Sequence, residues 1–250
     1  GSKTPDDYAE KSINMIKKGF KSLKFDPFSG PWSEYPDIEV LESAKIVLER
    51  IRDAVGPTIN LLIEAHRRFA PMNAIRAARM MEPFNPYWFE EPCPSDNIPA
   101  IKEVRDNVSI PIVTGEALYT RSNFRELLHK RAADIINPDI CNTGGILEIT
   151  QIAAMAEPYY VAVSPHGWNS TSIGAAAAIH ASATMPNFII YEYMVQVEEI
   201  SKHISNGYNE PEDGYLELPQ SAGLGVSIDE TVIKNYAYRQ YPPRNLRTIQ

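Results

Sequence analysis

The chain has 250 residues, of which 44% are hydrophobic and 22% are charged, and its formal net charge is −8. This composition supports one large domain with a hydrophobic core and excludes a disordered chain, while the negative charge argues against a nucleic acid or an anionic membrane as partner. No apolar run is long enough to span a membrane, and Cys93 and Cys141 are too few for a disulfide framework, so we expect a cytoplasmic protein with a small-molecule ligand.

The first two readable elements are amphipathic helices. Thr4 is suited to cap a helix with Pro5 at its first position and Asp7 at its third. Apolar residues then follow at helical spacing, at Ala9, Ile13, Ile16 and Phe20. A second helix is predicted from about Asp37 to Gly56, with Val40, Ala44, Val47, Leu48 and Ile51 on one stripe.

Short apolar or β-branched runs then alternate with helical patterns. These predicted strands cover residues 22–25, 60–65, 87–91, 110–116, 134–139, 160–166 and 187–193, and a helical pattern follows each except the last. Alternation of a buried strand with an amphipathic helix is typical of βαβ units, so the sequence predicts a parallel sheet.

One polar residue stands near the end of each strand from the second onward. These residues recur every 23 to 27 positions, at Glu64, Glu90, Glu116, Asp139, His166 and Glu192. A spacing of one βα unit favours a closed (β/α) barrel over an open sheet. Because the carboxyl ends of barrel strands open on one face, we expect these six ionisable groups to share one mouth.

Glu64, Glu90 and Glu116 give the strongest functional signal. Carboxylates held close together repel one another unless a cation neutralises them. An all-oxygen site suits Mg²⁺ before Mn²⁺, and the lack of clustered histidine or cysteine argues against zinc. The alternative is that these glutamates pair with nearby arginines such as Arg67 or Arg121.

Asp139 and His166 end successive strands, so a hydrogen bond between them is expected. Such a bond fixes the imidazole tautomer and raises its basicity, which suits a general base. The alternative is a lone structural histidine. Cys93 has no evident basic partner and is not favoured as a nucleophile.

Lys24 and Asp26 share one face of the first strand. With His66 and Glu192 they could bind a polar, anionic substrate, and the alternative for each is an ordinary surface ion pair. The tail from about residue 200 is rich in turn-forming residues and lacks the alternation of strand and helix. We therefore divide the chain into a catalytic barrel over 1–200 and a covering segment of the same domain over 201–250.

In combination, four motifs resemble a known family. "YWFEEP", "IPIVTGE", "INPDICNTGG" and "VSPHGWN" are similar to the barrel domain of the enolase superfamily, mandelate racemase subgroup, from about residue 5 to the tail. The resemblance implies a modified (β/α)7β barrel with Mg²⁺ at Glu64, Glu90 and Glu116. It also implies that His166 is the base, supported by Asp139, and that Glu192 contacts the substrate carboxylate.

The departures from the family pattern are informative. Where racemases of the subgroup carry Lys-x-Lys, this chain has Lys24-Phe25-Asp26, so a second lysine base is missing and proton removal from one side is expected. Glu64 stands where aspartate is usual, and Ala222 where proline is usual. His66 matches a histidine of galactonate-type dehydratases that protonates a leaving hydroxyl. The family's N-terminal capping domain and first barrel strand are not visible, so we expect a fragment or a truncated product.

The resemblance implies Mg²⁺-dependent dehydration of a sugar acid (an aldonate) to a 2-keto-3-deoxy acid, through proton abstraction α to the carboxylate and an enediolate. Lys24 and the metal would bind the substrate carboxylate, His166 would remove the C2 proton, and His66 would assist loss of the C3 hydroxyl. The alternatives are a racemase, epimerase or cycloisomerase of the same superfamily, or a non-catalytic barrel fragment. Since relatives usually assemble, we expect a homo-oligomer.

Overall fold

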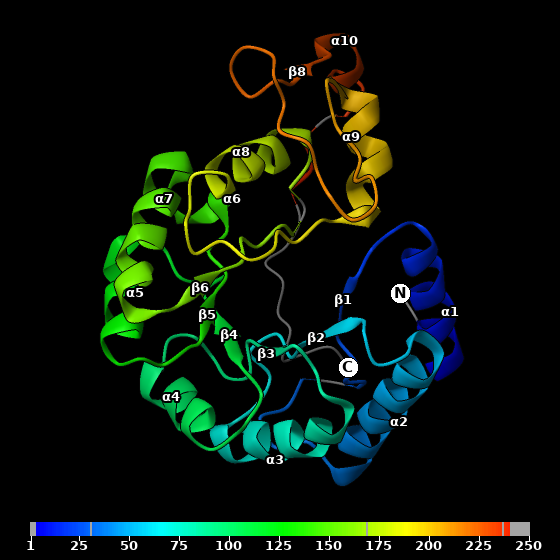
Figure 1. The fold of residues 1–250 in the computed structure, drawn as a ribbon, viewed down its shortest axis with the longest axis vertical. Coiled ribbons are helices and arrows are strands. Elements are labelled where there is room, and N and C mark those ends of the chain that lie inside the picture. Colours follow the sequence, from blue (N-terminus) through cyan, green and yellow to red (C-terminus); the bar gives the residue numbers. More distant parts are fainter. Residues whose placement is uncertain (1–3, 31, 169, 237, 241–250) are drawn as a thin grey trace.

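A parallel sheet forms the centre of the computed structural model, which describes residues 4–30, 32–168, 170–236 and 238–240 (Figure 1). Its strands lie in chain order, each parallel to the next. They are β1 (Ser22–Phe25), β2 (Asn60–Glu64), β3 (Trp88–Glu90), β4 (Ile112–Thr114), β5 (Ile135–Ile136) and β6 (Ala162–Val163). This arrangement confirms the predicted βαβ units and gives a partial (β/α) barrel.

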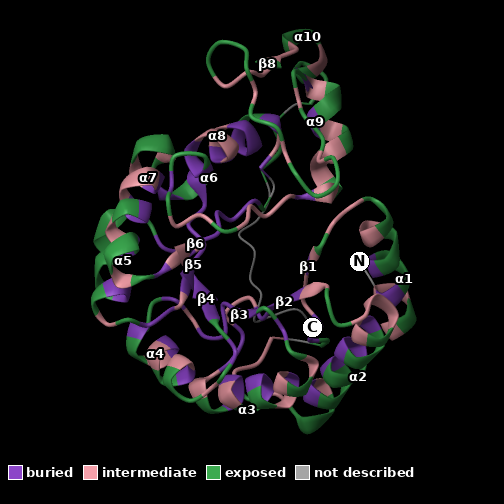
Figure 2. Cartoon of the chain, viewed as in Figure 1, coloured by how far each residue is buried: buried purple, intermediate pink, exposed green. Residues whose placement is uncertain are grey.

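Helices surround the sheet, and their buried faces turn toward it (Figures 1 and 2). They are α1 (Pro5–Lys17), α2 (Ile38–Val55), α3 (Pro71–Met81), α4 (Ile98–Asp106), α5 (Thr120–His129), α6 (Ile140–Thr143), α7 (Gly145–Ala156) and α8 (Ser172–Ser182), with short 3₁₀ turns at Glu82–Phe84, Glu157–Tyr159 and Val195–Val197. The largest buried side chains between helices and sheet are Phe69, Phe89 and Phe124. A smaller cluster of Leu62, Trp88, Val113 and Ile135 fills the inner face of the sheet.

The predicted helix signals are confirmed at the start of α1. The Thr4 hydroxyl accepts a hydrogen bond from the Asp7 N–H, and the Asp7 carboxylate accepts one from the Thr4 N–H. Phe20 was expected on the helix but lies beyond it, because α1 ends at Lys17 and Gly19 takes a left-handed conformation with φ +94°.

The predicted seventh strand, residues 187–193, is wrong as a regular strand. Val163 makes an isolated parallel bridge to Phe188, and the Ile189 N–H donates to the Val163 carbonyl at 3.0 Å. Among the described residues no strand pairs with the other side of this segment, so the sheet remains open between it and β1. A pocket of about 540 Å³ lies there, with Ser22 and Lys24 on one wall and Ile190 and Glu192 on the other.

The tail forms α9 (Glu198–Ile204), a two-stranded antiparallel ribbon of β7 (Ser205–Asn206) and β8 (Ser227–Ile228), and α10 (Glu230–Ile233). It lies beside α8 (Figure 1), where His180 Nε2 is 3.2 Å from the Leu224 carbonyl oxygen. Helix α9 crosses the predicted boundary at residue 200, and the division into 1–200 and 201–250 stays a prediction. Within the described part of the chain, every helix is too short or too polar to cross a membrane.

Gly115 is a backbone position on which the mouth depends. Its φ is +141°, and an added Cβ would lie 2.9 Å from the Phe124 ring and 3.3 Å from the Asn137 nitrogen. We expect Gly115→Ala to lower the free energy of unfolding by about 4 kcal/mol, since backbone strain and overpacking add. Gly56→Ala is the control for strain alone, because its φ is +77° but an added Cβ would meet no atom within 4 Å, and we expect it to cost about 2 kcal/mol. Equal losses in urea unfolding would contradict the packing argument.

Candidate active site

Three glutamates converge at the carboxyl ends of neighbouring strands. Glu64 and Glu90 are partners in the register of β2 and β3, and Glu116 follows β4 by two residues. One carboxylate oxygen from each lies within 4.8 Å of the others. Glu64 and Glu90 are buried, and the Glu116 side chain is 11% exposed. The predicted convergence of the three carboxylates is therefore confirmed.

Two cationic side chains also reach this cluster. Lys24 contacts Glu90 and lies 3.3 Å from Glu64, while Arg67 contacts Glu116. Arg121, the other arginine considered from the sequence, pairs instead with Glu148 at 3.2 Å. The expected alternative of pairing with a basic residue thus holds for Arg67, and Lys24 adds to it.

Burial disfavours the charged form of the glutamates in this cluster. Burial raises the pKa of Glu64 to about 7, although Lys24 opposes the shift, and raises the pKa of Glu90 well above its usual range. At Glu116 burial acts in the same direction but is outweighed by the hydrogen bond from His166 and the charges of Arg67 and Lys24, so the pKa of this carboxyl is lowered. The cluster therefore favours additional positive charge.

The three glutamates fit a hard divalent cation. All of the donor atoms are carboxylate oxygens, the ligand type that such ions prefer. Glu64 Oε2 is buried and, among the described residues, accepts no hydrogen bond, although Lys24 Nζ lies 3.3 Å away. An incompletely satisfied buried carboxylate beside two others is the arrangement that a cation would stabilise.

His166 and Asp139 form the predicted pair. Their backbones are joined by a parallel bridge beyond β5 and β6, and His166 Nδ1 lies 2.7 Å from Asp139 Oδ2. The other ring nitrogen, Nε2, lies 2.9 Å from Glu116 Oε2. Burial lowers the pKa of His166, but the hydrogen bonds to Asp139 and Glu116 outweigh it and raise this pKa to about 10. A cation at Glu116 would compete with His166 for that carboxylate, which would lower the pKa of the imidazole and free Nε2 to accept a proton.

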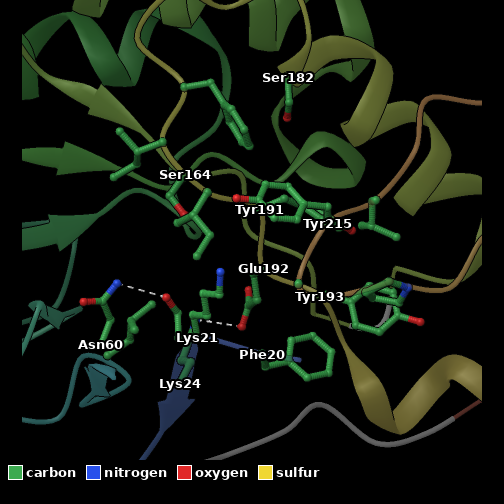
Figure 3. Close-up of a pocket in the computed structure, with 18 of the residues that line it drawn as sticks. Phe20, Lys21, Lys24, Asn60, Ser164, Ser182, Tyr191, Glu192, Tyr193 and Tyr215 are labelled. Atoms are coloured by element: carbon green, nitrogen blue, oxygen red, sulfur yellow. Dashed lines mark hydrogen bonds and ion pairs between the residues drawn. The ribbon is translucent and has the colours of Figure 1, made fainter. Parts of the chain in front are cut away.

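Lys24 and Glu192 meet across the open side of the sheet (Figure 3). Lys24 Nζ lies 2.8 Å from Glu192 Oε1, and the Gly167 N–H donates to Glu192 Oε2 at 2.8 Å. Burial disfavours the charge of Lys24, but Glu192 and Glu90 outweigh it and raise the pKa of the ammonium well above its ordinary value. Lys24 is thus a fixed cation beside the carboxylate cluster.

His66 and Asp26 contact each other at the edge of the mouth. His66 Nδ1 lies 2.9 Å from Asp26 Oδ2, and the His66 backbone N–H donates to Glu64 Oε1 at 2.5 Å. His66 and Arg67 both have left-handed backbones, with φ of 52° and 62°, which turns the chain sharply after β2. The side chain of His66 is 35% exposed, so the imidazole remains accessible.

Several polar contacts of the mouth were not anticipated from the sequence. Glu90 accepts hydrogen bonds from Trp88 Nε1 at 3.0 Å and from Asn137 Nδ2 at 2.8 Å. Glu91, the second acidic residue of "EEP", is fully buried and accepts hydrogen bonds from Thr114 and Gly115. Burial raises the pKa of Glu91 to about 7, with Glu116 adding to the effect. In the sequence, the position of Glu91 between the strand-end Glu90 and Pro92 was the feature that could have indicated these contacts.

A family model described as enolase C-terminal domain-like matches residues 7–232. Among curated relatives, a D-gluconate dehydratase of Thermoproteus tenax is 32% identical over 240 residues, which cover 94% of this chain and 47% of the relative. A D-gluconate/D-galactonate dehydratase of Picrophilus torridus is 29% identical over 94% of this chain and 59% of the relative. The chain therefore spans about half the length of these relatives.

Solved structures give the same result for the fold. A mandelate racemase/muconate lactonizing enzyme from Jannaschia sp. CCS1 superposes with a TM-score of 0.90 at 31% sequence identity, over 96% of this chain and 62% of that one. The resemblance inferred from the four sequence motifs is confirmed.

Divalent cation binding provides a test of the glutamate cluster. We expect Mg²⁺ or Mn²⁺ to bind with one strong site by calorimetry, and Glu116→Gln to weaken binding by more than the roughly 10- to 100-fold that loss of an outer-shell partner costs. Glu126→Gln is the matched control, because Glu126 lies on α5 and pairs with Lys130 at 3.1 Å. Equal affinities of the two variants would contradict the assignment of Glu116 as a ligand.

Proposed function

The chain belongs to the enolase C-terminal domain-like family, and we propose that the protein dehydrates a sugar acid to a 2-keto-3-deoxy acid. The single observation that carries the proposal is the placement of two histidines around the carboxylate cluster. His166 contacts Glu116, and the backbone N–H of His66 contacts Glu64. His66 follows β2 and His166 follows β6, so the two histidines come from different parts of the sheet. The names of the two curated relatives support a sugar acid as the substrate class.

Glu64, Glu90 and Glu116 are the proposed ligands of Mg²⁺, which when bound would supply positive charge that stabilises the anion formed on loss of the C2 proton. Lys24 would bind the substrate carboxylate, because its side chain is only 18% exposed and its ammonium is held by Glu192 at 2.8 Å. The resemblance implied that Glu192 contacts the substrate carboxylate. Here Glu192 would instead hold Lys24, and Lys24 would contact that carboxylate. This arrangement avoids direct contact between two anions.

The first chemical step is assigned to His166. Nε2 would accept the C2 proton while Nδ1 keeps its hydrogen bond to Asp139 at 2.7 Å. The electron pair of the broken C–H bond moves into the substrate carboxylate and gives the enediolate. Asp139 would stabilise the imidazolium that forms and keep the ring oriented.

The second step is assigned to His66 in its protonated form. The electron pair returns to form a C2–C3 double bond as the C3–O bond breaks. His66 Nε2 donates its proton to the leaving hydroxyl, which departs as water. The resulting enol then ketonises to the 2-keto-3-deoxy acid, taking up a proton at C3 and losing the enol proton to water. The C2 proton and the proton given to the leaving hydroxyl thus each have a named nitrogen.

Racemisation by the same site is less well supported. It requires a second base on the opposite face of the substrate, at the position where the subgroup has the second lysine. Asp26 occupies that position here, and its carboxylate is already engaged by His66 and Arg68. Elimination needs only one base and one acid, which the two histidines provide.

The proposal is tested by incubating the protein at its full natural length with Mg²⁺ and a panel of aldonates in D₂O. We expect a semicarbazide-reactive keto acid from the wild type, and a loss of about 10²- to 10⁴-fold in both keto acid formation and C2 exchange for His166→Asn. His129→Asn, at an exposed position on α5, is the control for loss of an imidazole. Exchange at the wild-type rate in His166→Asn would remove His166 from its role, and epimerised sugar acid without keto acid would replace dehydration by epimerisation.

A further inference from the structure

A second group of charged and aromatic side chains surrounds His66 and is not used by the mechanism above. It consists of Asp26, at the residue after β1, together with Arg68 and Trp32. The ring of Trp32 lies 5.6 Å from the ring of His66, and the guanidinium of Arg68 lies 5.3 Å over the ring of Trp32. The His66 side chain therefore lies among charged and aromatic side chains of the folded chain.

The carboxylate of Asp26 makes three hydrogen-bonding contacts inside this group. Oδ1 accepts a hydrogen bond from the Phe28 N–H at 2.8 Å, and Oδ2 accepts one from Arg68 Nη2 at 2.8 Å. His66 Nδ1 lies 2.9 Å from the same Oδ2. Three of the roughly four acceptor positions of this carboxylate are thus taken, so the contacts favour support of His66 over the role in substrate binding expected from the sequence.

Arg68 fixes Asp26 from the interior. It is 4% exposed, and its Nη1 donates to the Phe28 carbonyl oxygen at 3.0 Å. Its guanidinium lies over the ring of Phe28 and over the ring of Trp32, at 5.6 and 5.3 Å from their centres. A buried guanidinium that is bonded and stacked in this way has little rotational freedom, so it holds the carboxylate in one orientation.

The hydrogen bonds of the Asp26–His66 pair repeat those of the Asp139–His166 pair. In each pair one carboxylate oxygen accepts from the backbone N–H two residues ahead, Phe28 for Asp26 and Cys141 for Asp139, both at 2.8 Å. The other oxygen lies against a histidine Nδ1, at 2.9 Å for His66 and 2.7 Å for His166. The same support thus stands behind both imidazoles, and in both it leaves Nε2 as the nitrogen available for proton transfer.

We propose that Asp26, held by Arg68, is a positioning residue that fixes the Nδ1–H tautomer of His66 and aims its Nε2 at the leaving hydroxyl. The inference rests on the proposed function for the identity of that hydroxyl. It adds that the protein contains two aspartate–histidine pairs with separate tasks. Asp139 supports proton removal at C2, and Asp26 supports proton donation at C3.

The test separates the two tasks in one assay. In D₂O, deuterium at C2 of recovered substrate reports proton removal by His166, and keto acid reports elimination. We expect Asp26→Asn to lower keto acid formation by about 10- to 100-fold, by analogy with the loss of other outer-shell partners of histidine. C2 proton removal should change less than about threefold, so recovered substrate becomes enriched in deuterium. Asp26→Glu, which keeps the carboxylate, should recover part of the loss.

A double variant shows whether Asp26 acts through His66. We expect Asp26→Asn to cause no further loss of elimination in a His66→Asn background, since the group it positions is already absent. The matched control is Asp134→Asn. Asp134 also accepts hydrogen bonds from an arginine, Arg105, and from a backbone N–H, that of Ile112. However, it lies just before β5, at the amino end of the strand, whereas the site lies at the carboxyl ends. This control should leave the ratio of exchange to elimination unchanged.

Imidazole ¹⁵N NMR provides a readout independent of turnover. The His66 signal, assigned by its loss in His66→Asn, should show Nδ1 protonated in the neutral ring of the wild type and should change in Asp26→Asn. If Asp26→Asn lowers exchange and elimination equally, or leaves both unchanged, the positioning role is overturned. If the wild type neither exchanges nor dehydrates any aldonate, the proposed function fails, and the tautomer measurement alone decides whether Asp26 positions His66.

Discussion

Repulsion among buried carboxylates is the constraint on which the mouth of this barrel depends. Register places Glu64 beside Glu90, and Glu116 reaches the same point from β4, so oxygens of all three lie within 4.8 Å. Their charges are balanced in part by Lys24 and Arg67 and by the imidazole of His166. Because carboxyl groups outnumber these cationic groups in the described mouth, the arrangement favours a further cation.

This electrostatic constraint links cation binding at the glutamates to the residues assigned to the reaction. Two of the three cationic groups that contact the glutamates, Lys24 and His166, are also those assigned to the substrate. Lys24 is the proposed partner of the substrate carboxylate, and His166 shares Glu116 with the proposed metal. A cation that takes up the charge of Glu116 would release Nε2 of His166, so occupation of the glutamate cluster and readiness of the base would be coupled. His66 is supported separately, by Asp26 and Arg68.

The alternation of strands and helices could be predicted because buried strands and capped amphipathic helices leave local patterns, as at Thr4 and at the run ending in Glu64. The regular spacing of the strand ends then allowed us to predict that Glu64, Glu90, Glu116 and the Asp139–His166 pair lie together. The contact between Asp26 and Arg68 could not be predicted, because it depends on a left-handed turn at His66 and Arg67 that non-glycine residues rarely adopt. Residues 187–193 were predicted as a strand from their apolar and aromatic residues, whereas in the structure this segment makes only an isolated bridge to β6 and no regular ladder.

We propose above all that Glu64, Glu90 and Glu116 share one divalent cation. Anomalous scattering from crystals of the protein soaked in Mn²⁺ would locate that cation. We expect one dominant anomalous peak, within about 2.0–2.6 Å of an oxygen from each of the three glutamates. Strong Mn²⁺ density elsewhere, with these carboxylates still paired to Lys24 and Arg67, would contradict it.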